Sequence, residues 1–227
     1  MNTQPSLNQQ RICRRAVAIL LFFTLGLMSA GYWSYRVEVS KIADGYYQTL
    51  AAINHLKCSQ IQQWRKERTA EIERAAKDSL TVKGVRDVLG APDNPDFQKE
   101  LRDCLEEEMQ DTEHRSALLF DTKANLLATN DPDSVHLYDA TRQAIRKALA
   151  SHAPVFSNFY RASDGEVHID LAASVCDQEG EVLAVLVLRH EAATYLYPLI
   201  SALLTPSGSA ETLLVMRDGE DVLFLSD

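Results

Sequence analysis

The chain has 227 residues, of which 46% are hydrophobic, and a formal net charge of −9. This length allows one or two domains with a buried core. The acidic charge argues against nucleic-acid binding and against lying flat on anionic lipid, since both need a basic surface. A small ligand stays open, because one local pocket can oppose the net field.

The first feature along the chain is an uncharged apolar run, Ala16 to Tyr35, which follows three arginines. Its roughly 20 residues, at about 1.5 Å each, match the ~30 Å hydrocarbon core of a bilayer. Arginines before such a run stay on the cytoplasmic side, and the aromatic residues at its end suit the opposite interface. We therefore expect a cytoplasmic segment 1–15 and a single-pass membrane helix 16–35. The bulk of the chain would lie outside the cytoplasm.

A cleaved signal peptide is the alternative to a retained anchor. Its small-x-small cleavage motif would have to be Met28-Ser29-Ala30, in which Met28 is too large for the first position. The aromatic cluster that follows this motif is typical of an anchor rather than of a mature N-terminus. The sequence therefore favours a retained membrane helix.

Residues 36–80 have the pattern of one long helix. Apolar side chains recur mostly every three or four residues, and the remaining positions are rich in Lys, Glu, Gln and Arg. Such a helix packs along one face and would connect a distal domain rigidly to the membrane. We expect it to pair with the same helix of a second copy, which would make the protein a homodimer.

Residues 81–204 are predicted to form a distal α+β module. Its expected elements are a short helix after Thr81, a helix at 97–114, strands at 116–122 and 126–130, a helix at 139–151, and strands at 155–163, 167–177 and 182–192. The last strand is apolar on both faces until Arg189, which predicts a central position. We expect a mostly antiparallel five-stranded sheet with helices on one side.

The end of the chain predicts the start of a second module. Tyr195–Leu204 has a helical pattern but is too short and too briefly apolar to span a membrane. Residues 206–209 indicate a linker, and 211–227 contain two short strands around Asp218-Gly219. A lone hairpin is marginally stable, so residues 205–227 are interpreted as the first hairpin of an incomplete membrane-proximal module. These strands either pair with another segment or the natural sequence continues.

The cysteines and histidines give no clear covalent or metal framework. Cys58, Cys104 and Cys176 lie beyond the anchor without C-x-x-C spacing. A Cys58–Cys104 disulfide and buried free thiols both remain open. No histidines pair at helical spacing, and neither His168 with Asp170 nor His190 with Glu191 has a third ligand at a suitable spacing. We predict no metal and no cofactor.

The chain resembles the double Cache (PAS-like) extracytoplasmic sensor domains of bacterial sensor histidine kinases, diguanylate cyclases and chemoreceptors. The resemblance lies in an I-x-x-W-x-x-E-R pattern on the long helix (Ile61, Trp64, Glu67 and Arg68), in the hairpin LLFDTKANLLATN, in the meander DGEVHIDLAASVCDQEGEVLAVLVLR and in the hairpin ETLLVMRDGEDVLFLSD. It implies a small-molecule sensor in signal transduction, such as a two-component system. The resemblance implies a receptor of the bacterial inner membrane, with its bulk periplasmic or extracellular. These residues contain no kinase, cyclase or methyl-accepting sequence, so we interpret the chain as truncated before the output domain: a fragment, a truncated gene product or a degenerate copy.

In PAS-like sensors the ligand pocket lies between the sheet and the segments that cover it. Alternation along 167–175 places His168 and Asp170 on one face, which is either solvated or lines the pocket. The predicted ligand-binding residues are Tyr160, Arg161, Asp170 and Arg189. Arginine could bind a carboxylate and aspartate an amine, whereas the alternative is ordinary cross-strand ion pairs.

The subgroup of these domains that binds amino acids has a Tyr, Arg, Trp, Tyr and Asp set. That set cannot be placed on this chain, because no tryptophan follows Trp64. This weakens the expectation of an amino-acid ligand without removing it.

Three functions follow from these observations. The first is the ligand-sensing region of a membrane receptor, which binds a small molecule carrying a carboxylate or an amine. The second is a truncated sensor that acts as a dimerisation or decoy partner. The third is a membrane-tethered enzyme, which the sequence disfavours because it lacks G-x-S-x-G, H-E-x-x-H, S-x-x-K and a glycine-rich phosphate loop.

Overall fold

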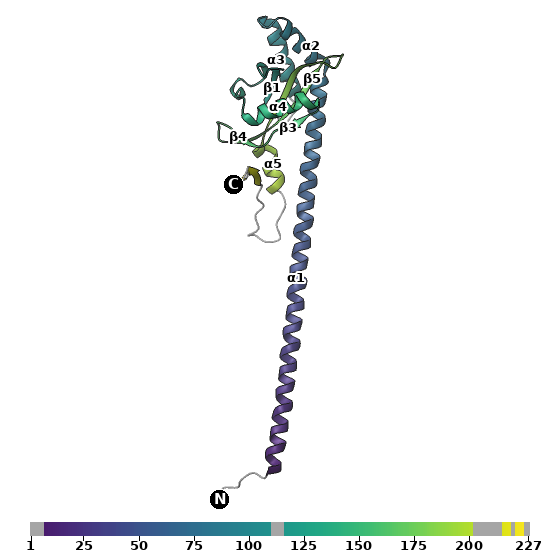
Figure 1. Ribbon diagram of the computed structural model, residues 1–227, viewed down its shortest axis with the longest axis vertical. Helices are drawn as coiled ribbons and strands as arrows, with labels where there is room; N and C mark the ends of the chain where they lie inside the picture. Colours follow the sequence, from purple (N-terminus) through teal and green to yellow (C-terminus); the bar gives the residue numbers. More distant parts are fainter. Residues whose placement is uncertain (1–6, 110–115, 202–214, 219–220, 225–227) are drawn as a thin grey trace. The chain divides into compact units, whose positions relative to one another are not determined.

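A computed structural model describes residues 7–109, 116–201, 215–218 and 221–224 (Figure 1). The chain divides into two compact units, Met1–Leu56 and Lys57–Asp227. Helix α1 (Leu7–Lys77) contributes residues to both units. The predicted membrane helix and most of the predicted long helix are therefore parts of α1.

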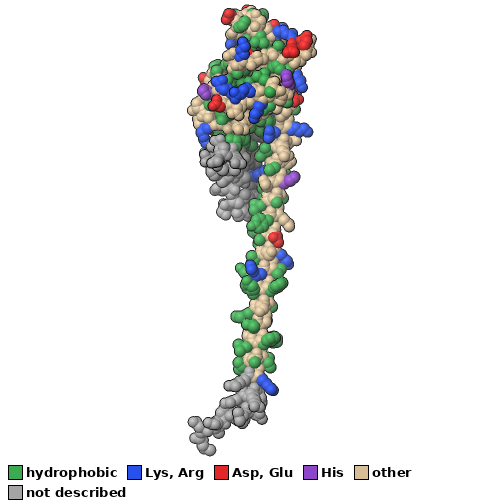
Figure 2. All heavy atoms as spheres, viewed as in Figure 1, with side chains coloured by type: hydrophobic (Ala, Val, Ile, Leu, Met, Phe, Trp, Pro, Cys, Tyr) green, Lys and Arg blue, Asp and Glu red, His purple; other side chains and the backbone are tan. Residues whose placement is uncertain are grey.

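Residues 16–35 of α1, in the first unit, are uncharged, mostly apolar and exposed. Phe22, Phe23 and Trp33 are 80%, 69% and 75% exposed. Figure 2 shows hydrophobic side chains crowded along this stretch. In a search of the described residues, α1 is the one helix that is long and apolar enough to cross a membrane.

The second unit has the predicted α+β class. After the end of α1, its elements are α2 (Ser79–Gly90), α3 (Pro95–Met109), β1 (Ser116–Asp121), β2 (Leu126–Thr129), the 3-10 helix η1 (Pro132–Ser134), α4 (Asp139–Ser151), β3 (Val155–Phe156), β4 (Tyr160–Arg161), β5 (Val167–Cys176), β6 (Val182–Glu191), α5 (Ala192–Ser201), β7 (Val215–Asp218) and β8 (Asp221–Phe224).

The main sheet is antiparallel, with the strand order β2-β1-β6-β5-β3, and β4 also pairs with β5. The central position predicted for β6 is confirmed. The sheet has six strands rather than five because the strand predicted at 155–163 is interrupted. At the break, the Ser157 hydroxyl accepts a hydrogen bond from the Asp170 backbone N–H at 2.9 Å and donates to the Asn158 carbonyl at 2.7 Å. The side chain of Ser157 thus takes over a role of the backbone in the ladder.

Helices cover both faces of the sheet, which corrects the expectation that they lie on one side. The end of α1 packs with α2 and α3 on one face, through Ile72, Val85 and Leu101. On the opposite face α4 contributes Ile145 and Ala148 to a separate cluster. Strands β1 and β6 are apolar on both faces, so both faces need cover.

The junction between α1 and α2 has a local cause. The Asp78 carboxylate accepts hydrogen bonds from the backbone N–H groups of Leu80 (2.8 Å) and Thr81 (3.2 Å). Asp78 is therefore the N-cap of α2. This cap ends α1 at Lys77, three residues before the predicted boundary.

The helix after β6, the C-terminal hairpin and the cysteines agree only in part with the predictions. Helix α5 begins at Ala192 rather than Tyr195, and the predicted strands 215–218 and 221–224 form the hairpin β7–β8. Among the described residues, Cys58, Cys104 and Cys176 form no disulfide, and Cys58 is exposed rather than buried. The predicted helix end at 110–114, the end of the predicted helix at 202–204 and the predicted linker at 206–209 lie outside the described residues.

The β1–β2 turn depends on one carboxylate. Asp121 accepts hydrogen bonds from the backbone N–H groups of Lys123 (2.8 Å) and Asn125 (2.7 Å) and from the Asn125 side-chain amide (2.8 Å). Partial burial raises the pKa of Asp121, but these hydrogen bonds and the Lys123 charge outweigh it, so the pKa falls below its ordinary value. The ionised carboxylate therefore stabilises the turn.

We expect Asp121→Ala to lower the free energy of unfolding at neutral pH by about 1 kcal/mol, because the turn loses its acceptor. A depressed folded-state pKa stabilises above the unfolded-state pKa, and this stabilisation is lost as the pH falls through the folded-state value. The difference between the wild type and Asp121→Ala should therefore shrink in denaturant titrations at acid pH. Asp93→Ala, at an exposed position in the α2–α3 loop, is the control. A loss that stays equal at neutral and acid pH would contradict this account.

Candidate ligand-binding site

The sheet register brings three of the four predicted site residues together. Asp170 on β5 lies directly opposite Arg189 on β6. Tyr160 on β4 lies opposite His168, the residue two positions before Asp170 on the same face of β5. Residues that are directly or diagonally opposite on one face are within contact distance. The alternation along β5 predicts the face that His168 and Asp170 share, whereas the positions of Tyr160 and Arg189 beside it depend on the strand register.

Asp170 is the centre of the group and is fully buried. Its carboxylate accepts hydrogen bonds from the Tyr160 hydroxyl at 2.8 Å and from Arg189 Nε at 3.1 Å and Nη2 at 3.4 Å. Arg189 Nη2 also donates to the His136 carbonyl at 3.2 Å. A buried ion pair is tolerated only where the remaining polar atoms are also bonded, and here several of them are.

Sequence reasoning missed two polar partners of Asp170. The Thr141 hydroxyl donates to Asp170 Oδ2 at 2.5 Å, and Ser157 bonds the Asp170 backbone N–H. Thr141 lies three residues before Ala144 and four before Ile145, on the buried stripe of α4. Its place on that stripe is a signal that could have identified it. Ser157 gave no such signal, because its role depends on the strand break.

The Asp170 carboxylate raises the pKa of both Tyr160 and Arg189. Burial raises the pKa of the Tyr160 phenol well above its ordinary value, and the Asp170 carboxylate adds to this effect. Burial opposes the charge on Arg189, but the Asp170 carboxylate outweighs it and raises the pKa of Arg189. The group therefore holds a neutral tyrosine beside the Asp170–Arg189 pair.

Aromatic rings form a layer around Arg189. The Tyr138 and Tyr160 ring centroids are 4.5 Å apart, and Arg189 Cζ lies 5.4 Å from the first and 5.8 Å from the second. The Tyr138 hydroxyl accepts a hydrogen bond from the Ser163 backbone N–H at 2.9 Å. Tyr138 thus connects the segment before α4 to the β4–β5 hairpin.

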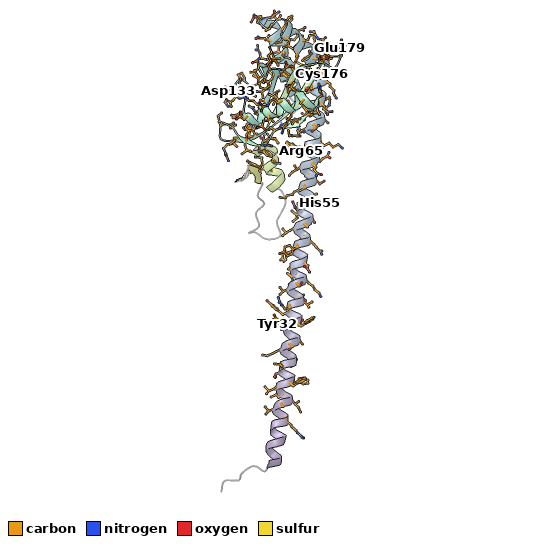
Figure 3. All side chains as sticks on the ribbon, in the orientation of Figure 1. Tyr32, His55, Arg65, Asp133, Cys176 and Glu179 are labelled. Atoms are coloured by element: carbon orange, nitrogen blue, oxygen red, sulfur yellow. The ribbon has the colours of Figure 1, made fainter. Side chains whose placement is uncertain are left out.

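A small polar cavity of about 170 Å³ opens at this layer. Two acidic side chains, Asp133 and Asp164, lie on its wall with Arg189 and His168. His168 is almost completely buried, and its Nε2 lies 3.5 Å from Asp164 Oδ2. Asp133, labelled in Figure 3, belongs to η1. The full lining is Asp133, His136, Tyr138, Ala162, Ser163, Asp164, His168 and Arg189.

Arg161, the fourth predicted residue, is separate from this cavity. Its side chain is exposed, and Nη1 donates to the Gly165 carbonyl at 2.6 Å across the hairpin. Asp170 and Arg189 do form a cross-strand ion pair, as the alternative interpretation expects, but both side chains are buried rather than on a solvated face. Within the described residues, no three His, Cys, Asp or Glu side chains lie close enough to hold a metal ion.

Solved structures share this fold. The sensor domain of the histidine kinase DctB from V. cholerae matches with a TM-score of 0.52 and 17% identity, over 71% of this chain and 62% of that chain. The ligand-binding domain of the Pseudomonas fluorescens chemoreceptor CtaA, in complex with L-alanine, is also similar, with a TM-score of 0.49 and 19% identity over 68% of this chain and 63% of that chain. So is the ligand-binding domain of the Pseudomonas aeruginosa PAO1 chemoreceptor PctC, in complex with GABA, with a TM-score of 0.48 and 18% identity over 69% of this chain and 64% of that chain. The chain therefore spans less than two thirds of the length of these neighbours.

The fold is that of Cache-type extracytoplasmic sensor domains, and the resemblance seen in the sequence is confirmed at this level. No protein-family model matches the sequence, and no curated protein is similar to it. At 17% identity, the likeness to the DctB sensor domain establishes the architecture of the chain and not its ligand.

We expect Asp170→Ala to lower the free energy of unfolding by about 3–5 kcal/mol, because it leaves Arg189 buried without its counter-charge. Denaturant titration of the second unit's transition measures this loss. Arg161→Ala is the matched control and should change the stability by less than about 1 kcal/mol, since that side chain is exposed.

The double variant Asp170→Leu/Arg189→Met tests whether the loss in Asp170→Ala comes from the unpaired charge of Arg189. It removes both charges, and should recover a large part of the stability lost in Asp170→Ala. Equal losses in Asp170→Ala and Arg161→Ala would show that the buried ion pair does not hold this region together.

Proposed function

We propose that the chain is the ligand-sensing region of a membrane-anchored receptor, of the sensor histidine kinase type, and that a small molecule binds in the polar cavity. The observation that carries the proposal is this cavity, built on the buried group of Asp170, Arg189, Tyr160 and Thr141. The fold shared with the DctB sensor domain supports the receptor class. The chemoreceptor neighbours are solved in complex with L-alanine and GABA, but the ligand of this chain has to be argued from its own residues.

The charges on the cavity wall favour a ligand with an amine. Arg189 is already neutralised by Asp170 at 3.1 Å, and its Nη2 is bonded to a backbone carbonyl. The carboxylates of Asp133 and Asp164 lie on the same wall. A cationic amine would be attracted by these carboxylates, and it could pack against the Tyr138 ring. The volume of about 170 Å³ restricts the ligand to a small molecule.

We expect a small primary amine or zwitterion to raise the melting midpoint of the full chain in detergent micelles. A ligand at about 100 times its dissociation constant stabilises by roughly 2.7 kcal/mol. A panel of small amines, amino acids and the matching amine-free carboxylates, screened by thermal melting, tests this. The double variant Asp133→Asn/Asp164→Asn should lose the midpoint shift, because both changes remove negative charge from the cavity wall.

Arg161→Ala controls for charge changes on the hairpin outside the cavity, and it should keep the full shift. Two results would contradict the proposal. One is a panel in which no compound raises the midpoint. The other is an amine whose midpoint shift is the same in the wild type and in Asp133→Asn/Asp164→Asn.

The proposed anchoring rests on α1. Residues 16–35 form an apolar stretch of this helix after the arginines, and their side chains are exposed. We propose that this stretch crosses the inner membrane once, with residues 1–15 in the cytoplasm and the rest outside. Exposed apolar side chains also recur beyond it, including Val39, Ile42, Tyr46 and Leu50. They support pairing of α1 with the same helix of a second copy, since a spacing of three and four residues forms one helical face.

Protease added to intact spheroplasts should degrade the second unit and leave a short fragment protected, as expected for an N-terminus inside. Immunoblotting with an antibody to a tag on the N-terminus measures the fragment. A cytoplasmic protein in the same cells must stay intact, and detergent lysis must expose the tag. Full-length chain that survives in intact spheroplasts and is cut only after lysis would reverse the proposed orientation.

A further inference from the structure

The second unit contains another cavity, on the opposite face of the sheet from the polar one. Its volume is about 350 Å³, and Ile169 of β5 lines it whereas the neighbouring His168 lines the polar cavity. Successive side chains of a strand point to opposite faces. The two cavities are therefore separate sites that share one strand.

The walls of this second cavity are apolar and aromatic. Ligand sites for small molecules are typically about 300–1,000 Å³ in volume and lined by such side chains, with a few polar groups that fix orientation. The walls come from α1, the β3–β4 segment and α5, mainly through Ile61, Trp64, Phe156, Phe159 and Leu196. Trp64 and Phe156 are in contact, with ring centroids 5.8 Å apart. The interior is thus suited to a hydrocarbon or aromatic group.

One cation lies at the edge of this cavity. Arg65 lines it from α1, beside α5 in Figure 3, and its Cζ lies 4.7 Å from the centroid of the Phe156 ring. Among the described residues, the Arg65 guanidinium has no hydrogen bond and no ion pair, and its side chain is exposed. A guanidinium held over an aromatic ring keeps its donors available for an anion. Asn158, also on the wall, adds an exposed amide near the same strand break.

We propose that this cavity is a second binding site, for a small apolar carboxylate whose ring or chain packs on Trp64 and Phe156 and whose carboxylate pairs with Arg65. The polar cavity has the opposite preference, because its wall carries Asp133 and Asp164. The unit would then bind two chemically different ligands on two faces of β5. The cavity is formed partly by α1, so its ligand contacts the helix that runs toward the membrane segment.

The test uses the full chain in lipid nanodiscs, with phenylacetate as the probe. The chain has two tryptophans, Trp33 and Trp64, so the variant Trp33→Phe leaves Trp64 as the reporter inside the cavity. Phenylacetate should change the Trp64 emission in a saturable way. Phenethylamine, which has a similar shape but the opposite charge, should not. Empty nanodiscs correct for partition of the probe into lipid.

Arg65→Gln should weaken phenylacetate binding by about tenfold or more, as expected when a charge-assisted pair is lost. The residue is exposed, so the melting midpoint of Arg65→Gln should stay close to that of the parent. Arg65→Lys should keep part of the affinity, since it keeps the charge. Asp133→Asn/Asp164→Asn changes the polar cavity and should leave phenylacetate binding unchanged, which distinguishes this site from the first.

Equilibrium dialysis with radiolabelled phenylacetate measures the same binding without the tryptophan. The proposal is overturned if neither the emission nor the retained label exceeds that of empty nanodiscs. It is also overturned if Arg65→Gln binds phenylacetate as tightly as the parent, or if Asp133→Asn/Asp164→Asn abolishes binding.

Discussion

The structure of the second unit depends on the buried carboxylate of Asp170. Its oxygens receive hydrogen bonds from β4, β6 and α4, through Tyr160, Arg189 and Thr141. Removing two charges from water costs several kcal/mol per ion, so an ion pair at this position adds little net stability over apolar side chains. The pair instead fixes how the elements are placed. All three donors can reach the carboxylate only when β5 pairs with β6 in this register and α4 lies in this position.

The cavity geometry follows from that placement. With Arg189 fixed, Nη2 reaches the His136 carbonyl, and the guanidinium carbon lies 5.4 Å from the Tyr138 ring centroid and 5.8 Å from that of Tyr160. Tyr138 in turn bonds to Ser163 of the hairpin. The segment before α4 and the hairpin are thus both connected to the buried Asp170 group, and Leu137 of that segment also packs against the core on the α4 side. A ligand in the polar cavity would therefore meet a preorganised floor.

The sequence was sufficient for the order of elements and the central position of β6, since both follow from the periodicity of strands and helices. It named Tyr160, Asp170 and Arg189 as candidates, but their grouping depends on the strand register, which periodicity does not give. It was not sufficient for the side of the sheet that α4 covers, because an apolar stripe specifies a buried face but not its partner. Arg161 was included because an arginine can bind a carboxylate, yet it lies on the opposite face of the strand from Tyr160, since adjacent residues on a strand point apart. The cavity beside Arg65 was unpredictable, because it joins segments about 90 residues apart along the chain.

Strand β5 is the element through which the two cavities could influence each other. His168 and Ile169 are neighbours on it, so a ligand on either face contacts the same stretch of backbone. A ligand changes a conformational equilibrium only through a difference in affinity between two states. Asp170 is fully buried and bonded on both oxygens, which makes the centre of the strand the costliest part to move. A response to ligand therefore has to be taken up at the edge of the sheet, where Ser157 interrupts the ladder between β3 and β4. That edge forms part of the apolar cavity and contacts Arg65 of α1 through Phe156, which gives the sheet a direct physical connection to the long helix.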